Sequence, residues 1–190
     1  NLAGLKVVMP STPYDAKGLM KTAIRDNNPV IFFEHQAFGL DDLTGPVPEE
    51  EYTIPFGKAD IKLDGRDVTV IAIAEMVHES LIAAMALEPE GISIEILDPR
   101  SLVPLDRETI HRSVRKTGRV IIVDEACTTG SAAAEIMAVI TEDLDTFRSL
   151  KTPPKRVCAP DVPIPYSPVL ESYCIPDSNQ IITAIRAILS

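Results

Sequence analysis

Short β-rich runs alternate with helical patterns along most of the chain, and this alternation restricts the possible fold more than any other feature. Strand-like runs stand at residues 6–9, 30–33, 68–74, 92–97, 120–123 and 156–159. Most are separated by stretches in which apolar residues recur every three or four positions, as on one face of a helix. Strands joined by single helices favour right-handed crossovers and a mostly parallel sheet. The sequence therefore predicts an α/β protein with three layers, α/β/α.

The first predicted helix has clear signals at both ends. Thr12 suits the N-cap, Pro13 suits the first helical position, and Asp15 follows three residues after the cap. The sequence Asn27-Asn28-Pro29 predicts the end of this helix. The Val30–Phe33 run that follows is continuously apolar, so we expect a strand that is buried on both faces.

The segment from Gly39 to Phe56 separates two parts of the chain. It lacks periodicity, contains several prolines and includes the charged run Glu49-Glu50-Glu51. Such a composition is typical of a linker between domains. We therefore divide the chain into residues 1–50, the tail of one α/β domain with its linker, and residues 51–190, a second α/β domain.

The second part repeats the alternation of strands and helices. We predict helices at residues 76–88, 106–118 and 131–144, and a last helix capped by Asp177 or Ser178. In the first of these helices the apolar residues, Met85 among them, are expected to face the core. Residues 160–176 are rich in proline, so we expect an extended, ordered loop there.

Charge and hydropathy exclude several classes of protein. The formal net charge is −10, from 18 basic and 28 acidic residues, and basic residues form no cluster. We therefore expect no nucleic acid and no membrane surface as a partner. No apolar run approaches the roughly 20 residues that cross a bilayer. A signal-peptide pattern is absent and the three cysteines are widely spaced, so we expect free thiols and no secretion.

No common catalytic or nucleotide-binding motif occurs in the sequence, which lacks a Gly-rich phosphate loop and a nucleophile elbow. His35 follows an apolar strand, where it faces either a ligand crevice or an interface. His78 and His111 lie in the first turns of helices, and solvated or interface roles are favoured for both. Asp124 and Glu125 follow a strand, where paired carboxylates can bind a metal, act as acid and base, or suit the positive N-terminus of the next helix. We favour the helix N-terminus.

The C-terminal end of the first helix offers a candidate cation site. Its last carbonyl groups, around residues 23–26, have no donors within the helix, and the helix dipole places negative charge there. Asp26 adds a carboxylate, and Asn27-Asn28 turns the chain. The segment is therefore either a site for a hard cation with oxygen ligands or an ordinary helix end.

Several blocks of the sequence are distinctive when they are taken together. They are residues 4–19 (GLKVVMPSTPYDAKGL), 23–29 (AIRDNNP), 34–35 (EH), 52–59 (YTIPFGKA), 100–106 (RSLVPLD), 117–126 (TGRVIIVDEA) and 159–171 (APDVPIPYSPVLE). With these blocks the chain resembles the beta subunit of the thiamine-diphosphate-dependent 2-oxo acid dehydrogenases. The pyruvate, branched-chain and acetoin types of that family share them.

The resemblance implies that residues 1–50 are the tail of a pyrimidine-binding domain and that residues 51–190 are a transketolase-like C-terminal domain. In this family the diphosphate and its magnesium belong to the alpha subunit. The glutamate that contacts the aminopyrimidine ring belongs to the part upstream of this segment. The resemblance therefore places no catalytic and no cofactor-binding residue in the chain, and we expect the chain alone to be inactive.

One site carries over from the family. Its members can bind a structural potassium ion through main-chain carbonyls, with one further ligand upstream. The matching positions are Ala23, Ile24, Asp26 and Asn28. Two departures from the family pattern concern other positions. Ala74-Glu75 stands where many relatives have Gly-Arg or Ser-Arg, and Lys151 lies near a position where some relatives hold the acyltransferase through an acidic residue.

The expected function is therefore that of the C-terminal part of a 2-oxo acid dehydrogenase beta subunit. The segment would serve assembly with the alpha subunit and a second beta subunit in a heterotetramer, and docking of the dihydrolipoyl acyltransferase. The alternatives are a non-catalytic flavodoxin-like binding module and the C-terminal domain of an acetoin dehydrogenase or transketolase relative. We expect the cytoplasm of a bacterium or the mitochondrial matrix of a eukaryote as the location.

Overall fold

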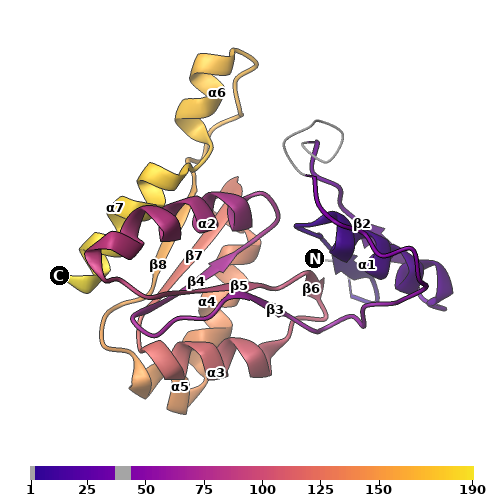
Figure 1. The fold of residues 1–190 in the computed structure, drawn as a ribbon, viewed down its shortest axis with the longest axis horizontal. Coiled ribbons are helices and arrows are strands. Elements are labelled where there is room, and N and C mark those ends of the chain that lie inside the picture. Colours follow the sequence, from indigo (N-terminus) through magenta and orange to yellow (C-terminus); the bar gives the residue numbers. More distant parts are fainter. Residues whose placement is uncertain (1–2, 37–43) are drawn as a thin grey trace.

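The computed structural model describes residues 3–36 and 44–190, which form two sheets with helices around them (Figure 1). The smaller sheet has the strand order β2-β1-β6, from β1 (Lys6–Val8), β2 (Val30–Phe32) and β6 (Ser101–Val103). Strand β1 pairs in parallel with β2 and antiparallel with β6. Since β6 comes from the second part of the chain, the smaller sheet joins the two parts.

The larger sheet has five strands in the order β3-β5-β4-β7-β8. They are β3 (Asp60–Leu63), β4 (Val68–Ala72), β5 (Ile94–Asp98), β7 (Val120–Cys127) and β8 (Lys155–Ala159). All neighbouring strands are parallel except β3, which runs antiparallel to β5 at one edge. The predicted mostly parallel sheet is confirmed, and β3 and β6 are strands that the sequence analysis missed.

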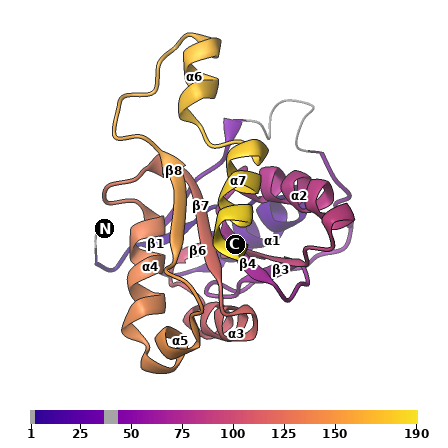
Figure 2. The ribbon, with the colours of Figure 1, turned by 90° about the vertical axis from the view of Figure 1, so that its left-hand side faces the viewer.

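Helices cover both faces of the larger sheet (Figure 2). One face packs against α2 (Met76–Leu87) and α7 (Ser178–Leu189), and the other packs against α3 (Arg107–Thr117) and α4 (Ala132–Glu142). The short helices η2 (Glu88–Glu90) and α5 (Leu144–Ser149) follow α2 and α4. The three-layer α/β/α architecture is therefore confirmed. No helix in the described part of the chain is long and apolar enough to cross a membrane.

The smaller sheet packs against α1 (Pro13–Arg25) through the buried residues Val8, Leu19 and Ile54. The helix begins as predicted, since the Thr12 hydroxyl accepts the Asp15 backbone N–H at 3.1 Å. Ile54 reaches this cluster from the predicted linker, whose residues 39–43 lie outside the described residues. The boundary between residues 50 and 51 stays a prediction.

Other helix ends also follow the sequence. The Asp106 carboxylate accepts the Thr109 backbone N–H at 3.1 Å, and the Asp177 carboxylate accepts that of Gln180 at 2.8 Å. Helix α3 ends at Gly118, which has a φ of 75°. That left-handed conformation suits glycine, because glycine has no Cβ to clash with the backbone.

Three predictions from the sequence are wrong in detail. The proline-rich segment contains a helix, α6 (Pro168–Cys174), because proline is tolerated in the first turn of a helix. Met85 is 65% exposed, since α2 is apolar on nearly all sides and its pattern does not select one face. The run that forms β2 is not buried on both faces, as Ile31 and Phe33 are 38% and 49% exposed.

Candidate functional site

The two parts of the chain meet at two clusters of charged side chains. In the first, His35, which follows β2, lies beside Glu125, near the end of β7, with 3.1 Å between the His35 Nε2 and Glu125 Oε1 atoms. Both side chains are largely buried. Of the two roles considered for His35, the structure confirms the hydrogen bond at an interface.

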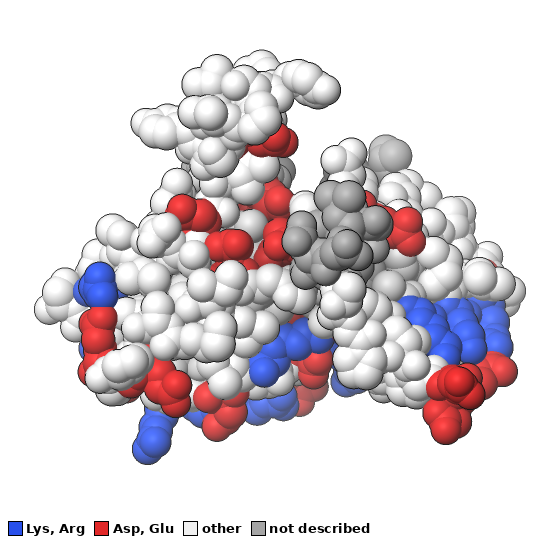
Figure 3. Space-filling view, turned by 45° about the horizontal axis from the view of Figure 1, so that its top comes forward, with Lys and Arg blue, Asp and Glu red and all other residues white. Residues whose placement is uncertain are grey.

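Glu75 adds a second carboxylate to this cluster. Burial raises its pKa, and the charge of Glu125 raises it further, whereas His78 and His35 oppose the change. Burial likewise raises the pKa of Glu125, against the effect of His35. The buried Oε2 atom of Glu75 has no hydrogen-bond partner among the described residues. The cluster thus holds two carboxylates whose pKa values are raised by burial, beside the imidazole of His35. Acidic side chains gather on the surface below α6, on the side that looks toward the N-terminal part (Figure 3).

Asp124 has a different role from its neighbour Glu125. Its carboxylate accepts the backbone N–H groups of Ala126, at 3.1 Å, and of Ala133, at 3.3 Å. Ala133 is in the first turn of α4, where backbone N–H groups lack partners within the helix. The favoured interpretation, a carboxylate at the next helix N-terminus, is confirmed for Asp124 and not for Glu125.

The other two histidines also make interface contacts. The His78 Nε2 atom lies 2.6 Å from the Ser11 carbonyl oxygen, which connects α2 to the segment before α1. The His111 Nδ1 atom lies 3.1 Å from the Thr146 hydroxyl, which connects α3 to α5, and burial lowers the pKa of His111. Interface roles are thus confirmed for both.

The second charged cluster is more deeply buried, and sequence reasoning missed it. The Lys62 ammonium lies 2.6 Å from Asp15, 2.8 Å from Asp60 and 3.6 Å from Asp98. The Arg100 guanidinium lies 3.0 Å from Asp15. The one local signal was the Thr12-x-x-Asp15 spacing, which indicated Asp15 as part of a helix cap and not of a charged cluster. The partners come together through tertiary structure alone.

Burial and pairing compete in this second cluster. Burial favours the neutral form of Asp15, but Lys62, Thr12 and Arg100 together lower its pKa. Burial raises the pKa of Asp98 to about 6. The pKa of Lys62 is raised because Asp98 and Asp15 outweigh the effect of its burial. The cluster holds α1 against β3 and β5, so it fixes the two parts of the chain together.

The candidate potassium ligands lie in the last turn of α1 and the residues after it. The Ala23 carbonyl oxygen already accepts the Asp26 backbone N–H at 3.3 Å. The Asp26 carboxylate pairs with Lys6 and accepts two hydrogen bonds from Asn28, so its pKa falls to about 2. Ile24 is exposed. Carbonyl oxygens suit a hard cation, but nothing in this geometry selects potassium, and the site stays a prediction.

No group of three or more His, Cys, Asp or Glu side chains among the described residues is placed to hold a metal ion. Lys151, discussed above as a docking position, donates to the Thr117 carbonyl oxygen at 2.9 Å and lies against the end of α3.

Comparisons with known proteins match both parts of the chain. The transketolase C-terminal domain matches residues 57–181, and the transketolase pyrimidine-binding domain matches residues 1–38. The acetoin:2,6-dichlorophenolindophenol oxidoreductase subunit beta of Cupriavidus necator is 49% identical over 98% of the chain and 54% of its own length. The pyruvate dehydrogenase E1 component subunit beta of Bacillus subtilis is 48% identical over 98% of the chain and 56% of its own length.

A solved structure supports the fold. It is described as a split gene transketolase, an inactive beta4 tetramer, and it superposes with a TM-score of 0.78 at 25% identity over 99% of this chain and 59% of its own. The chain thus spans little more than half the length of the relatives it matches.

Proposed function

Since this chain belongs to the transketolase C-terminal domain family, we propose that it forms the C-terminal portion of the beta subunit of a thiamine-diphosphate-dependent 2-oxo acid or acetoin dehydrogenase. One observation carries the proposal. A pyrimidine-binding segment precedes a three-layer C-terminal domain, and both align in one stretch, at 46–49% identity, with beta subunits of such enzymes. The split-gene transketolase shares the fold at only 25% identity, which favours the dehydrogenases.

The role proposed for this portion is structural. Its described residues contain no group of His, Cys, Asp or Glu side chains placed to hold magnesium, so we assign the diphosphate and its magnesium to an alpha subunit and derive no chemical step from this chain. What the chain does provide is a junction between its two parts. The cluster around Lys62 and the His35–Glu125 contact fix the pyrimidine-binding segment against the C-terminal domain. An active site shared between subunits needs such fixed geometry.

A projecting arm offers the surface for assembly. Helix α6 and the segment before it extend away from the rest of the molecule (Figures 1 and 2). The arm exposes a group of large apolar side chains, which are Val162, Ile164, Tyr166, Val169, Leu170 and Tyr173. Tyr166 is fully exposed. Contiguous exposed apolar surface of this kind marks protein–protein contact sites, so we assign the arm to contact with partner subunits, and docking of an acyltransferase belongs to the same proposal.

A chimera tests the function. Residues 3–190 of this chain replace the matching segment of the Bacillus subtilis pyruvate dehydrogenase E1 component subunit beta, which is then produced with its alpha subunit. We expect assembly and thiamine-diphosphate-dependent decarboxylation of a 2-oxo acid, measured as released carbon dioxide with an artificial electron acceptor. This chain alone should release none.

The arm variant Tyr173→Ser should reduce assembly of the chimera at least tenfold, as measured by size-exclusion chromatography. The matched control is Met85→Ser, which removes an exposed apolar side chain from α2 and should leave assembly unchanged. An assembled chimera without decarboxylation, or one active only in ketol transfer between sugar phosphates, would contradict the proposal.

A further inference from the structure

Asp98 is the least compensated charge in the cluster around Lys62. This last residue of β5 is completely buried. Its carboxylate accepts hydrogen bonds from the Ser11 hydroxyl and, at 2.8 Å, from the Arg100 backbone N–H. The Lys62 ammonium lies 3.6 Å from it, too far for a hydrogen bond, whereas the same ammonium lies 2.6 Å from Asp15. Among the described residues, an ionised Asp98 therefore receives no hydrogen bond from a charged side chain.

The charges of the cluster do not balance. It contains three carboxylates and two cations, which are Asp15, Asp60, Asp98, Lys62 and Arg100. When all of them are ionised, one negative charge is in excess, and a single proton removes it. Asp60 is partly exposed, so water stabilises its charge, and Asp15 contacts both cations. Asp98 is therefore the carboxylate that gains most from a proton.

The charged groups around Asp98 come from the elements packed against β5. Asp15 lies on α1, and Asp60 of β3 is paired directly with Asp98 in the sheet. Lys62 follows two residues later on β3. Burial raises the pKa of Asp98, with a further increase from the charge of Asp15. Lys62 and the Ser11 hydroxyl oppose this change, and the resulting pKa is about 6.

The hydrogen bond between Ser11 and Asp98 crosses from one part of the chain to the other. Ser11 immediately precedes the N-cap of α1, and Asp98 belongs to the C-terminal domain. A backbone hydrogen bond from Met9 to the Arg100 carbonyl oxygen, at 2.9 Å, joins the same two parts. On the other side of Ser11, the His78 Nε2 atom of α2 lies 2.6 Å from the Ser11 carbonyl oxygen. The protonation of Asp98 therefore acts where the two parts meet.

The two protonation states of Asp98 place different demands on this contact. A buried carboxylate without a full set of partners is costly, because it has lost its hydration. A protonated Asp98 donates its own hydrogen to the Ser11 hydroxyl, and the cluster is then neutral. An ionised Asp98 is stabilised when water enters, and water reaches a completely buried group only where the packed parts separate.

We propose that Asp98 is a proton switch, which closes the junction when it is protonated and loosens it when it is ionised. The loosened element is α1 with the segment before it, which separates from β3 and β5. Because the folded chain raises the pKa of Asp98 above its ordinary value, folding takes up a proton. The junction is thus most stable below about pH 4, loses stability as the pH rises toward 6, and changes no further above that. An inactive chimera would leave this switch standing, since it operates in the chain alone.

NMR of the Asp98 carboxyl carbon observes the titration directly in this chain, and Asp98→Asn assigns the signal. We expect a midpoint near pH 6. Asp60→Asn removes the excess negative charge by another route, so it should move the midpoint to lower pH. An Asp98 carboxylate that stays ionised down to about pH 4 would overturn the proposal. So would a midpoint that Asp60→Asn leaves unchanged.

Hydrogen exchange of the β1 backbone measures the loosening, because β1 pairs with β6 across the junction. Asp98→Asn mimics the protonated form, since an amide accepts the Arg100 N–H and donates to Ser11. The wild type and the variant are compared at the same pH, so that the chemical exchange rate cancels. For β1, the ratio of the wild-type rate to the variant rate should increase at least tenfold between about pH 4 and about pH 7. The ratio for β7, in the larger sheet, should not change, and a constant ratio for β1 would overturn the proposal.

Two further variants separate Asp98 from its neighbours. His78→Gln removes the imidazole and keeps a donor for the Ser11 carbonyl oxygen, so the pH dependence of β1 exchange should remain. Its disappearance would assign the pH dependence to His78 and overturn the proposal. Ser11→Ala serves if Asp98→Asn does not fold. It removes a hydrogen bond that favours the ionised carboxylate, so the NMR midpoint of Asp98 should rise, and an unchanged midpoint would contradict the switch.

Discussion

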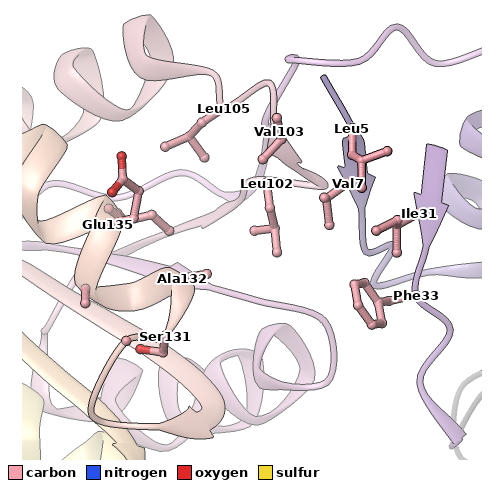
Figure 4. Close-up of a pocket in the computed structure, with 13 residues that line it drawn as sticks. Leu5, Val7, Ile31, Phe33, Leu102, Val103, Leu105, Ser131, Ala132 and Glu135 are labelled. Carbon is pink, nitrogen blue, oxygen red and sulfur yellow. The ribbon is translucent and has the colours of Figure 1, made fainter. Parts of the chain in front are cut away.

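The two sheets of this molecule are built from similar strands but differ in what covers them. The five-stranded sheet has a buried cluster on each face, one against α2 and α7 and one against α3 and α4. The three-stranded sheet has one such cluster, around Leu19, and its other face lines an apolar cavity of about 600 Å³ (Figure 4). Within the described residues, the larger sheet is therefore covered on both faces, whereas the smaller one is covered on one face and contacts the larger part through the charged junction.

The junction should therefore carry the largest single effect on stability. In Lys62→Met, the buried carboxylates of Asp15 and Asp98 lose their shared ammonium. Removing one partner of a buried ion pair costs about 3–5 kcal/mol, because it leaves an uncompensated charge. Urea denaturation at neutral pH measures the free energy of unfolding.

The control for this variant is Arg186→Met, which breaks an exposed pair with Glu90 on the surface of the larger domain. Exposed pairs are screened by solvent, so the control should change the free energy of unfolding far less. If Lys62→Met and Arg186→Met lowered the free energy of unfolding by similarly small amounts, the smaller sheet would not depend on the junction.

Truncations within the two sheets compare them directly. Ile121→Ala removes a fully buried side chain from the centre of the larger sheet and should cost about 2–5 kcal/mol. Ile31→Ala removes a side chain from the open face of the smaller sheet and should stay within about 0.5 kcal/mol. Both are measured by denaturant unfolding of the chain alone. An Ile31→Ala cost above about 2 kcal/mol in the chain alone would contradict the view that this face is open.

Much of the fold could be predicted from local signals. Thr12, Asp106 and Asp177 cap the starts of helices, and Gly118 ends one. Each of these contacts joins residues at most four positions apart, so the sequence alone can reveal it. The parallel strands of the larger sheet were predictable because each contains a short apolar run, whereas the antiparallel edge strand β3 has the mixed sequence Asp-Ile-Lys-Leu and was missed.

The rest depended on distant partners. Strand β6 is three residues long and becomes a strand only by pairing with β1, nearly a hundred positions earlier. The Lys62 cluster joins residues from α1, β3 and β5, which lie far apart in the sequence, so no local residue spacing predicts it. The run that forms β2 predicted cover on both faces, and the described chain supplies it on one.

The smallest effect is expected where the junction carries like charges. The pKa of Glu75 is raised mainly by burial, so its unfolded form releases a proton at a lower pH than the folded form does. Above the usual glutamate range, near pH 4.3, folding therefore becomes less favourable as pH rises toward the raised pKa, and below that range the effect is absent. Glu75→Gln removes this loss. Its melting temperature relative to the wild type should increase between pH 4 and pH 7, whereas the exposed control Glu142→Gln should show no such trend. If the melting-temperature difference between Glu75→Gln and the wild type stayed constant from pH 4 to pH 7, folding would not raise the pKa of Glu75, and the prediction would be wrong.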